Sequence, residues 1–344
     1  MIISGHQNLD FTTDGLADEA EPGGEVEFRN ATVPVQSHGS RLDRTLAEIV
    51  PEFSRSYLQQ LILAGAVRQN GAEVSKASGK VKAGDRLSVE LKPTPQSLAF
   101  KPEAMPLQVV FEDEFLLVLD KPAGLVVHPA PGNWSGTLLN GLLARDAQAS
   151  LLPRAGIVHR LDKDTSGLMV VARTRQTMDQ LILMIAQRTV SRQYLALGHG
   201  SWIGPKNRMV DLPVGRDPRN RLRMAAVNLA KTAGKVASTD FLLLENSAKH
   251  CLVRCSLHTG RTHQIRVHMA AMAHPLVADV LYGGKPEFGL DRQALHAFRL
   301  TFVHPLTQQD LTFDSLLPSD FQRTIERVGL VYNQMELCSS LESE

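Results

Sequence analysis

The chain has few cysteines, few aromatic residues and no long apolar runs. Its three cysteines, Cys251, Cys255 and Cys338, are too few for a disulfide framework and lack the paired spacing of a zinc site. Aromatic residues make up 5% of the 344 residues. The longest apolar stretches, 61–67 and 181–186, are far shorter than the roughly 20 residues that span a membrane. These absences exclude a disulfide-rich secreted protein and predict a protein without a membrane span.

The N-terminal ten residues have no basic segment followed by an apolar one. We therefore expect no secretory signal, and together with the scarcity of cysteine this predicts a cytoplasmic protein with reduced thiols.

The formal net charge of +1 hides an uneven distribution of charge. Residues 1–39 hold seven acids against one arginine, and residues 332–344 hold three glutamates and no base, so the part between them carries +10. We expect both acidic ends, 1–39 and 332–344, to be disordered because they lack hydrophobic periodicity. The body between them is basic, as in proteins that bind nucleic acids.

Residues 40–98 form the first expected domain. Leu42, Leu46 and Ile49 recur at helical spacing, a second helix is expected to begin after Ser54, and two short strands flank Asn70-Gly71. Two helices and a small sheet in this order resemble the S4 RNA-binding domain. The resemblance implies RNA contacts by three arginines on or beside the helices: Arg41, Arg44 and Arg55. Residues 40–92 hold nine bases and six acids, so charge alone also fits an ordinary solvated surface.

Residues 99–331 form the second expected domain, after a linker that contains Pro93 and Pro95. Apolar segments rich in Val, Ile and Leu alternate with helical segments, without a regular strand–helix–strand rhythm. The pattern predicts an α+β fold with a mixed, mainly antiparallel sheet. Strands are expected at 109–111, 116–119, 168–172 and 193–197, and a helix at 178–188.

The segment 156–173 contains His159-Arg160-Leu161-Asp162, followed by a Thr-Ser-Gly turn. We interpret it as a strand ending in a charged turn that is followed by a second strand. Charged residues in such a turn are presented at a sheet edge, where functional groups are often found. Alternatively, the turn is a solvated hairpin with salt-bridged charges.

Two further segments favour a functional interpretation. Arg192-Gln193-Tyr194 places a tyrosine 32 positions after Asp162, and Thr259-Gly260-Arg261-Thr262-His263-Gln264-Ile265-Arg266 is a turn that enters an expected amphipathic helix.

With these motifs, residues 40–331 resemble the pseudouridine synthases that act on large-subunit ribosomal RNA and carry an N-terminal S4 domain. The resemblance implies that Asp162 is the catalytic aspartate, Tyr194 an active-site tyrosine and Arg266 the basic partner of the aspartate. Arg160, with His159 before it, is similar to the arginine that helps to extrude the target uridine. The implied substrate is 23S rRNA or a pre-50S particle, in the region of helix 69.

The chemistry agrees with these side chains. Pseudouridine formation moves the bond of uracil to the ribose from N1 to C5, so it needs no redox cofactor and no metal. One ionised carboxylate suffices, whether Asp162 attacks C1′ or removes the 2′-proton, and a guanidinium beside it favours the ionised form. The sequence leaves both routes open.

The target uridine must be flipped out of its helix to reach a carboxylate, so a basic surface must hold the RNA backbone. Residues 206–235 carry a net charge of +6. Together with the Thr-Gly-Arg turn, this segment supplies the remaining expected RNA contacts: Arg216, Arg219, Arg221, Arg223 and Arg261.

Four histidines, His258, His263, His268 and His274, raise the question of zinc. His263 and His268 are five positions apart rather than four, so they do not share one helical face, and no metal is expected. Two other functions remain as alternatives. One is an RNA-binding assembly factor without catalysis, which intact Asp162, Tyr194 and Arg266 disfavour; the other is a nucleoside hydrolase, for which an S4-like domain has no purpose. A monomer is expected.

Overall fold

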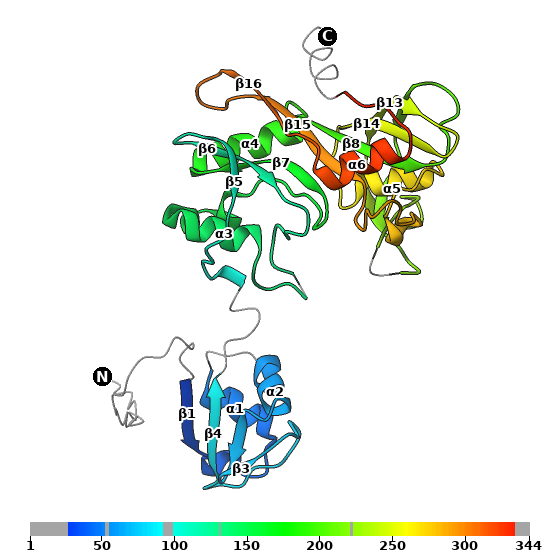
Figure 1. Ribbon diagram of the computed structural model, residues 1–344. Helices are drawn as coiled ribbons and strands as arrows, with labels where there is room; N and C mark the ends of the chain where they lie inside the picture. The colour runs from blue at the N-terminus through cyan, green and yellow to red at the C-terminus, as the bar shows by residue number, and fades with distance from the viewer. Residues whose placement is uncertain (1–26, 52–54, 92–98, 131, 221–222, 334–344) are drawn as a thin grey trace. The chain divides into compact units, whose positions relative to one another are not determined.

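The computed structural model describes residues 27–51, 55–91, 99–130, 132–220 and 223–333 (Figure 1). The chain divides into two compact units, Met1–Thr94 and Pro95–Glu344, a boundary a few residues before the expected one at 98/99. Most of the acidic N-terminal segment and most of the C-terminal tail, both expected to be disordered, lie outside the described residues.

The first unit is a four-stranded antiparallel sheet covered by two helices. The strand order is β1–β4–β2–β3. The elements are β1 (Glu27–Thr32), the 3₁₀ helix η1 (Val35–Ser37), α1 (Leu42–Ile49), α2 (Arg55–Leu63), β2 (Val67–Gln69), β3 (Ala72–Glu73) and β4 (Arg86–Leu91). The helical spacing of Leu42 and Leu46 and the turn at Asn70-Gly71 predicted these helices and the β2–β3 hairpin.

The sheet of this unit begins before residue 40, the predicted start of the domain, because β1 pairs with β4 along its whole length. The strand was not predicted because residues 27–32, at the sheet edge, contain no apolar run and mostly polar side chains. Val33, which follows β1, is buried in the core of this unit with Leu42, Leu46 and Ile62.

The second unit is built on a nine-stranded sheet with the order β5–β6–β7–β15–β8–β14–β13–β9, with β16 also paired to β15. Only β7 and β15 pair in parallel among the described strands, so the sheet is mixed and mainly antiparallel, as predicted. The strands are β5 (Gln108–Glu112), β6 (Leu116–Lys121), β7 (Ser166–Ala172), β8 (Ser191–His199), β9 (Asn207–Val210), β13 (Thr239–Asn246), β14 (His250–Leu257), β15 (Leu295–Val303) and β16 (Asp310–Asp314).

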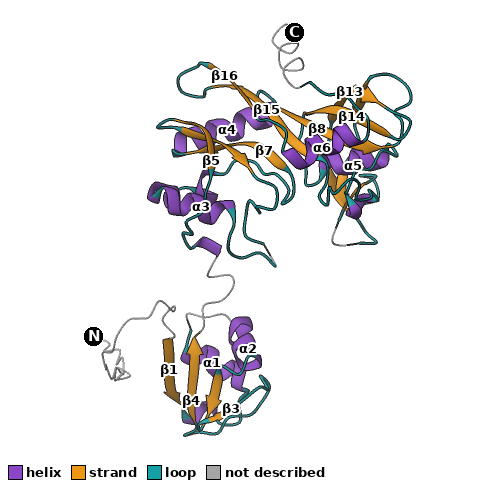
Figure 2. Ribbon diagram, viewed as in Figure 1, coloured by secondary structure: helices purple, strands orange, loops and turns teal. Residues whose placement is uncertain are grey.

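Helices cover both faces of this sheet (Figure 2). They are α3 (Leu138–Arg145), α4 (Arg175–Gln187), α5 (Gln264–Ala271) and α6 (Ser319–Arg327), with 3₁₀ turns η3 (Ala147–Leu151), η4 (Pro153–Gly156) and η5 (Val280–Tyr282). A separate three-stranded sheet has the order β11–β10–β12, formed by β10 (Val214–Arg216), β11 (Met224–Ala226) and β12 (Gly234–Lys235). No helix among the described residues is long and apolar enough to cross a membrane.

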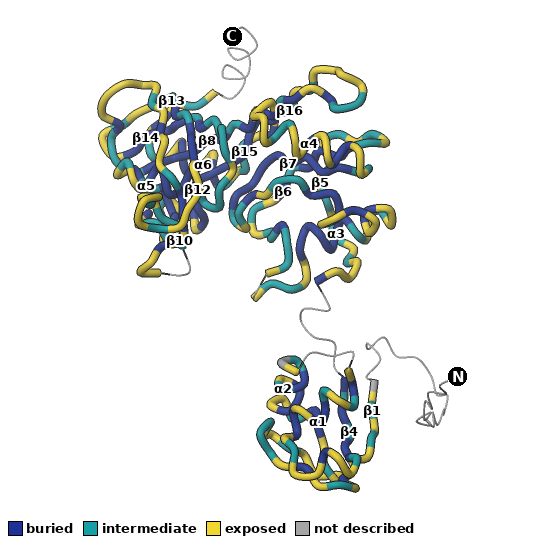
Figure 3. The backbone as a smooth tube through the Cα atoms, turned by 180° about the vertical axis from the view of Figure 1, so that it is seen from behind, coloured by how far each residue is buried: buried dark blue, intermediate teal, exposed yellow. Residues whose placement is uncertain are grey.

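Successive side chains of β8 point to opposite faces of the sheet, so each packs against the helices of one face only. Leu195 and Leu197 pack on the face that is covered by Phe321 of α6. Tyr194 and Ala196 point to the opposite face and pack in the core that contains Leu138 of α3 and Met269 of α5. The strands are buried through the centre of the unit and the loops at its rim are exposed (Figure 3). The face with α3 and α5 therefore carries the residues predicted to be catalytic.

Two local predictions need correction. Residues 156–158 do not form a strand; η4 ends at Gly156 and only Ile157 makes an isolated bridge, to Val171. Helix α5 is not amphipathic, because all residues from Gln264 to Met269 are buried. Its polar residues Gln264, Arg266 and His268 can be buried because each forms hydrogen bonds with other groups of the protein.

Candidate active site

Asp162 and Arg266, expected to pair from 104 positions apart, are in contact. Arg266 Nη1 donates to Asp162 Oδ2 at 3.0 Å. The side chain of Asp162 is 15% exposed and that of Arg266 is 8% exposed, so the pair lies at the boundary between core and solvent. A charge-assisted hydrogen bond of this kind is shorter and stronger than one between neutral groups.

A second carboxylate, Asp279, holds the other edge of the same guanidinium. Arg266 Nε and Nη2 donate to the two oxygens of Asp279 at 2.8 and 2.9 Å, and the ring of Tyr282 lies 5.0 Å from the guanidinium carbon. Burial alone disfavours the charged arginine, but the hydrogen bonds and charges of Asp279 and Asp162 outweigh it and raise the pKa of Arg266. Arg266 is therefore a fixed cation that presents one nitrogen to Asp162.

The turn that carries Asp162 is fixed from several directions. Lys121 is buried at the end of β6, and its Nζ donates to the carbonyl oxygens of Pro122, Leu125 and Lys163 at 2.8, 3.0 and 3.0 Å. Arg292 Nη1 donates to the carbonyl oxygen of Asp164 at 3.2 Å. These contacts hold the two residues that follow Asp162.

Gly167, at the start of β7, ends this turn at a point where only glycine fits. Its φ is +113°, and a Cβ atom there would lie 2.2 Å from the carbonyl oxygen of Ala297. The Thr-Ser-Gly part of the motif thus serves the close pairing of β7 with β15.

The turn before α5 is closed by Gln264. Its side-chain oxygen accepts from Thr259 Oγ1 at 2.7 Å and from the Arg261 amide at 3.0 Å, and its Nε2 donates to Thr239 Oγ1 at 2.8 Å. His263 begins the helix with a left-handed φ of 57°, and its Nδ1 lies 2.9 Å from the hydroxyl of Tyr282. His263 Nε2 is 3.9 Å from Asp162 Oδ1, which makes it a third neighbour of the carboxylate.

Asp162, His263 and Arg266 are among the residues that line a cavity of about 570 Å³. Tyr194 forms part of the wall and is 5% exposed; burial raises its pKa to about 12. Asp162 is the one carboxylate among the lining residues, whereas the arginines of the wall are Arg154, Arg160, Arg188, Arg192, Arg261 and Arg266. The cavity therefore offers one acid, one phenol and a strongly basic rim.

The residues expected to contact RNA in this unit have different surroundings. Arg160 is exposed at the cavity and has no hydrogen-bond or ion-pair partner among the described residues. Arg261 Nε donates to the Val236 carbonyl at 3.0 Å. His159 Nε2 accepts from the Val170 amide at 3.1 Å, and burial lowers its pKa to about 3. His159 is therefore neutral near pH 7, and its Nε2 is occupied by a hydrogen bond within the protein.

The basic segment 206–235 is only partly available to a ligand. Arg223 pairs with Asp217 at 2.6 Å, whereas Arg216 and Arg219 are exposed. Arg221 lies outside the described residues.

In the first unit, Arg41 and Arg55 both bind Asp43, at 3.0 and 2.9 Å, with about half of each side chain exposed. Arg44 pairs with Glu48 at 3.3 Å. Asp43 itself is fully buried, and the hydrogen bond from Arg41, with further ones from Gln59 and Arg55, lowers its pKa. Asp43 thus organises the arginines of this unit.

The four histidines considered for zinc are engaged separately. His258 binds Asp240 at 2.6 Å, His268 lies between Thr239 and Leu212, and His274 binds the His199 carbonyl and stacks on Trp202. With His263 beside Tyr282, they form no common ligand set.

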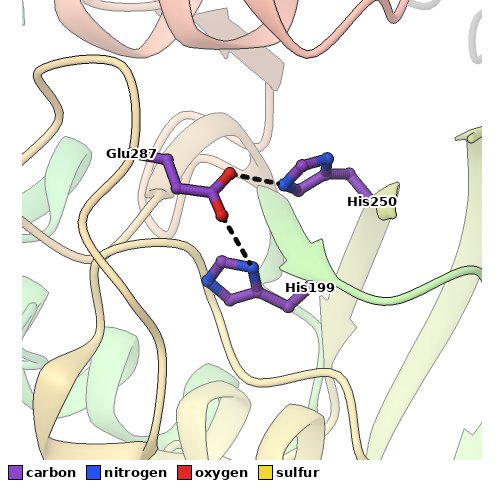
Figure 4. A group of neighbouring side chains, drawn as sticks. All are labelled: His199, His250 and Glu287. Atoms are coloured by element: carbon purple, nitrogen blue, oxygen red, sulfur yellow. Dashed lines mark hydrogen bonds and ion pairs between the residues drawn. The ribbon is translucent and has the colours of Figure 1, made fainter. Parts of the chain in front are cut away.

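A different group, His199, His250 and Glu287, has the ligand types of a metal site (Figure 4). Glu287 lies between the two rings, 2.7 Å from His250 Nε2 and 3.7 Å from His199 Nδ1. However, His199 Nε2 accepts a hydrogen bond from the Lys285 amide at 3.0 Å, so the ring proton is on Nδ1 and points toward the carboxylate. A cation at Nδ1 would need that nitrogen deprotonated and a proton on Nε2, opposite the amide proton of Lys285. The arrangement fits a hydrogen-bonded group better than a metal site.

This group instead supports the active site indirectly, by holding the loop 278–285. Lys285 closes the loop 278–285 by accepting from the Ala278 amide at 2.8 Å. The loop carries Asp279 and Tyr282, so the two histidines and Glu287 fix the segment that holds Arg266.

Sequence reasoning did not assign roles to Asp279, Tyr282, Lys121 or Arg192. For Asp279, a signal was present: a lone aspartate in the apolar run 276–281 must have a buried partner. For Arg192, the signal was its spacing of two from Tyr194, which puts both on one face of a strand. Nothing in the sequence indicated that Lys121 binds three carbonyl groups.

Comparison with known proteins agrees with this geometry. Residues 115–271 match the family model described as RNA pseudouridylate synthase, and residues 40–87 match the S4 domain. The chain is 44% identical to the ribosomal large subunit pseudouridine synthase D of Neisseria meningitidis serogroup B, covering 98% of this chain and 92% of the relative. The protein of the same name from Nitrosomonas europaea is 45% identical, covering 86% of this chain and 87% of its own length.

Among solved structures, human RNA pseudouridylate synthase domain containing 1 superposes with a TM-score of 0.53 at 25% identity, covering 71% of this chain and 98% of the human one. The human domain containing 4 has a TM-score of 0.51 at 23% identity, covering 65% of this chain and 94% of the human one, which supports the fold alone.

Proposed function

This chain belongs to the RNA pseudouridylate synthase family, and from that premise we propose that it converts selected uridines of large-subunit ribosomal RNA to pseudouridine. The names of the relatives and the S4 domain support ribosomal RNA as the substrate. In this proposal the substrate is 23S rRNA or a pre-50S particle, the target lies in the region of helix 69, and the enzyme acts as a cytoplasmic monomer without a metal.

The observation that carries the proposal is the Asp162–Arg266 pair at 3.0 Å in a cavity with a single carboxylate. Glycoside hydrolases generally use two carboxylates at the scissile bond, one of them to protonate the leaving group. Uracil leaves as a stabilised anion that is retained and rejoined, so a single carboxylate is sufficient. The composition of the cavity thus favours isomerisation over nucleoside hydrolysis.

The residues have separate roles in this proposal. Asp162 acts at the ribose, either by bonding to C1′ or by taking the 2′-proton, while Arg266 keeps it ionised and oriented. Tyr194 packs against the extruded uracil, and Arg160 fills the space that the base vacates in the RNA. Because Arg160 has no partner in the protein among the described residues, it is available for this contact.

Two measurements test the function. Chemical mapping of pseudouridine in 23S rRNA, incubated as free RNA or as pre-50S particles with the purified protein, should show new sites in the helix 69 region. Asp162→Asn should make none, while its affinity for the same RNA stays within about threefold of the wild type. Wild-type protein that binds this RNA and modifies no uridine would support the assembly-factor alternative and refute the enzymatic proposal.

A further inference from the structure

Arg192 is a buried arginine without a counter-ion in the wall of the active-site cavity. It lies on β8, is 6% exposed, and its Nε is buried without a hydrogen-bond partner. Within the described part of the chain, no side chain or carbonyl group binds its guanidinium. Other buried arginines of this unit each bind one carboxylate through two nitrogens: Arg266 with Asp279, Arg292 with Asp320 and Arg299 with Asp314.

The fold directs this guanidinium into the cavity beside Tyr194. The two residues are two apart on one strand, so their side chains leave the same face of the sheet. The turn before α5 packs directly against it, since a Cβ atom at Gly260 would lie 2.9 Å from Arg192 Nη1. A residue with a side chain at 260 would therefore displace the guanidinium.

Burying an unpaired cation costs several kcal/mol of folding free energy. The presence of Arg192 in this wall therefore indicates that a bound ligand supplies its partner. Its neighbours do not compensate it. Burial and the charge of Arg192 hold the pKa of His159 at about 3, and Tyr194, with a pKa of about 12, is also neutral near pH 7. Asp162, the one acid of the cavity wall, is bound to Arg266.

We propose that Arg192 donates hydrogen bonds to a carbonyl oxygen of the target uracil and stabilises the negative charge on that base after its bond to the ribose breaks. The proposal rests on the proposed function, because it assigns Arg192 to the same reaction. It makes Arg192 a further catalytic residue of the cavity.

The step is balanced without transfer of a proton from Arg192. When the C1′–N1 bond breaks, its electron pair stays on the uracil and is shared with the carbonyl oxygens. C1′ receives a pair from the Asp162 carboxylate, or from the C2′–H bond when Asp162 takes that proton. After the base rotates, C5 supplies the pair for the new C1′–C5 bond. As that bond forms, the C1′–O bond to Asp162 breaks and its pair returns to the carboxylate or, on the other route, the C1′=C2′ pair takes the proton back from Asp162 at C2′. The C5 proton then leaves to a base. Arg192 remains protonated throughout.

Two observations favour uracil over a backbone phosphate as the partner. Arg154, Arg160 and Arg188 are exposed at the cavity and so are accessible to the RNA backbone, whereas Arg192 is buried beside the ring of Tyr194. The charge on uracil also develops only as the bond breaks, so a pre-placed guanidinium interacts more strongly with the transition state than with the substrate.

The test is Arg192→Gln, measured by single-turnover rates at saturating RNA and by RNA affinity. Losing one such donor should lower the rate about 100-fold, with Kd within about threefold of the wild type. Arg175→Gln is the matched control, since Arg175 is an exposed arginine paired with Asp179 on α4, and it should change neither value. RNA with 5-fluorouridine at the target adds a specific readout. Its C5 has no proton to lose, so the rate of C1′–N1 bond breakage is compared on the two RNAs; because fluorine stabilises the uracil anion, the loss caused by Arg192→Gln should fall to about 10-fold or less.

A phosphate contact would give the opposite result: a weaker Kd, a salt dependence shallower by about one phosphate charge, and an unchanged rate at saturation. That outcome, or an equal loss of rate on both RNAs, would overturn the proposal. Thermal unfolding checks the fold, and if Arg192→Gln is unstable, Arg192→Lys is compared on the two RNAs instead. A wild-type protein that rearranges no uridine refutes the proposed function itself, whereas an active wild type with an equally fast Arg192→Gln refutes only the role of Arg192.

Discussion

Replacing Asp279 by asparagine distinguishes the roles of the two carboxylates that bind Arg266. Asp279 accepts two hydrogen bonds from Arg266 and its side chain is 1% exposed, whereas Asp162 accepts one and is 15% exposed. In Asp279→Asn an amide group replaces one carboxylate oxygen, so an NH₂ faces guanidinium N–H groups. The buried cation then keeps only its partly exposed partner.

The two substitutions should therefore differ in stability. Breaking a buried ion pair costs about 3–5 kcal/mol, and the remaining Asp162 contact puts Asp279→Asn near about 3 kcal/mol. In Asp162→Asn the guanidinium keeps its buried partner and loses one hydrogen bond, which costs about 1 kcal/mol. For a unit of this size, 1 kcal/mol shifts Tm by about 2–4 °C. We expect Tm to fall by about 6–12 °C for Asp279→Asn and by about 2–4 °C for Asp162→Asn.

The activities should follow a different order. Asp162→Asn removes the reacting group and should leave no measurable pseudouridine. Asp279→Asn should retain a reduced rate, because Asp162 is intact while Arg266 is less firmly held. Denaturant unfolding and single-turnover rates at a temperature where both variants are folded provide the data. A larger loss of stability for Asp162→Asn than for Asp279→Asn would refute the assignment of Asp279 as the structural anchor.

Three further predictions concern other buried ionisable groups. Burial lowers the pKa of Lys121 to about 8. Because the Lys121 ammonium holds the catalytic turn through three carbonyl groups, the rate at saturating RNA should fall as the pH rises through 8. Lys121→Gln should have a low rate that does not show this decline. His296 is fully buried, and burial lowers its pKa from an ordinary 6.5 to about 4. Between pH 4 and pH 6.5 the unfolded chain therefore binds a proton that the folded chain does not, so the free energy of unfolding should decrease as the pH falls through this range. Denaturant titration of His296→Gln should show a weaker dependence on pH. Asp43→Asn should leave Arg41 and Arg55 without their shared partner, destabilising the first unit and weakening RNA binding, while the saturating single-turnover rate is unchanged.

Local patterns predicted many elements well because their determinants are local. The apolar spacing that defines α1 and the Val- and Leu-rich runs of β6 and β7 are visible in a few adjacent residues. Strand β1 was missed because its main support is its partner strand β4, 54 to 64 positions further along the chain, and not its own composition. The segment 156–158 was predicted as a strand from its apolar character, but the left-handed residues of η4 before it prevent regular pairing.

For the site, the resemblance of the motifs predicted the contact between Asp162 and Arg266. The residues that hold this pair in place come from distant parts of the sequence, and the order of the strands in the sheet brings them together. Lys121 and Lys163 are 42 positions apart, and His199 and Lys285 are 86 apart. No periodicity in the sequence connects residues at such separations.

The seam between β7 and β15 has a mechanical consequence. These strands share only two aligned residue pairs, Ser166 with His296 and Ala297 with Gly167, and they join the half of the sheet that leads to Asp162 with the half that carries Tyr194. Thr165 and Leu295, which are next to these paired residues in the chain, line the cavity, so this narrow joint lies beside it. Any bending along this joint would move the turn of Asp162 relative to Tyr194, so the rigidity of the joint bears on the alignment of these two residues.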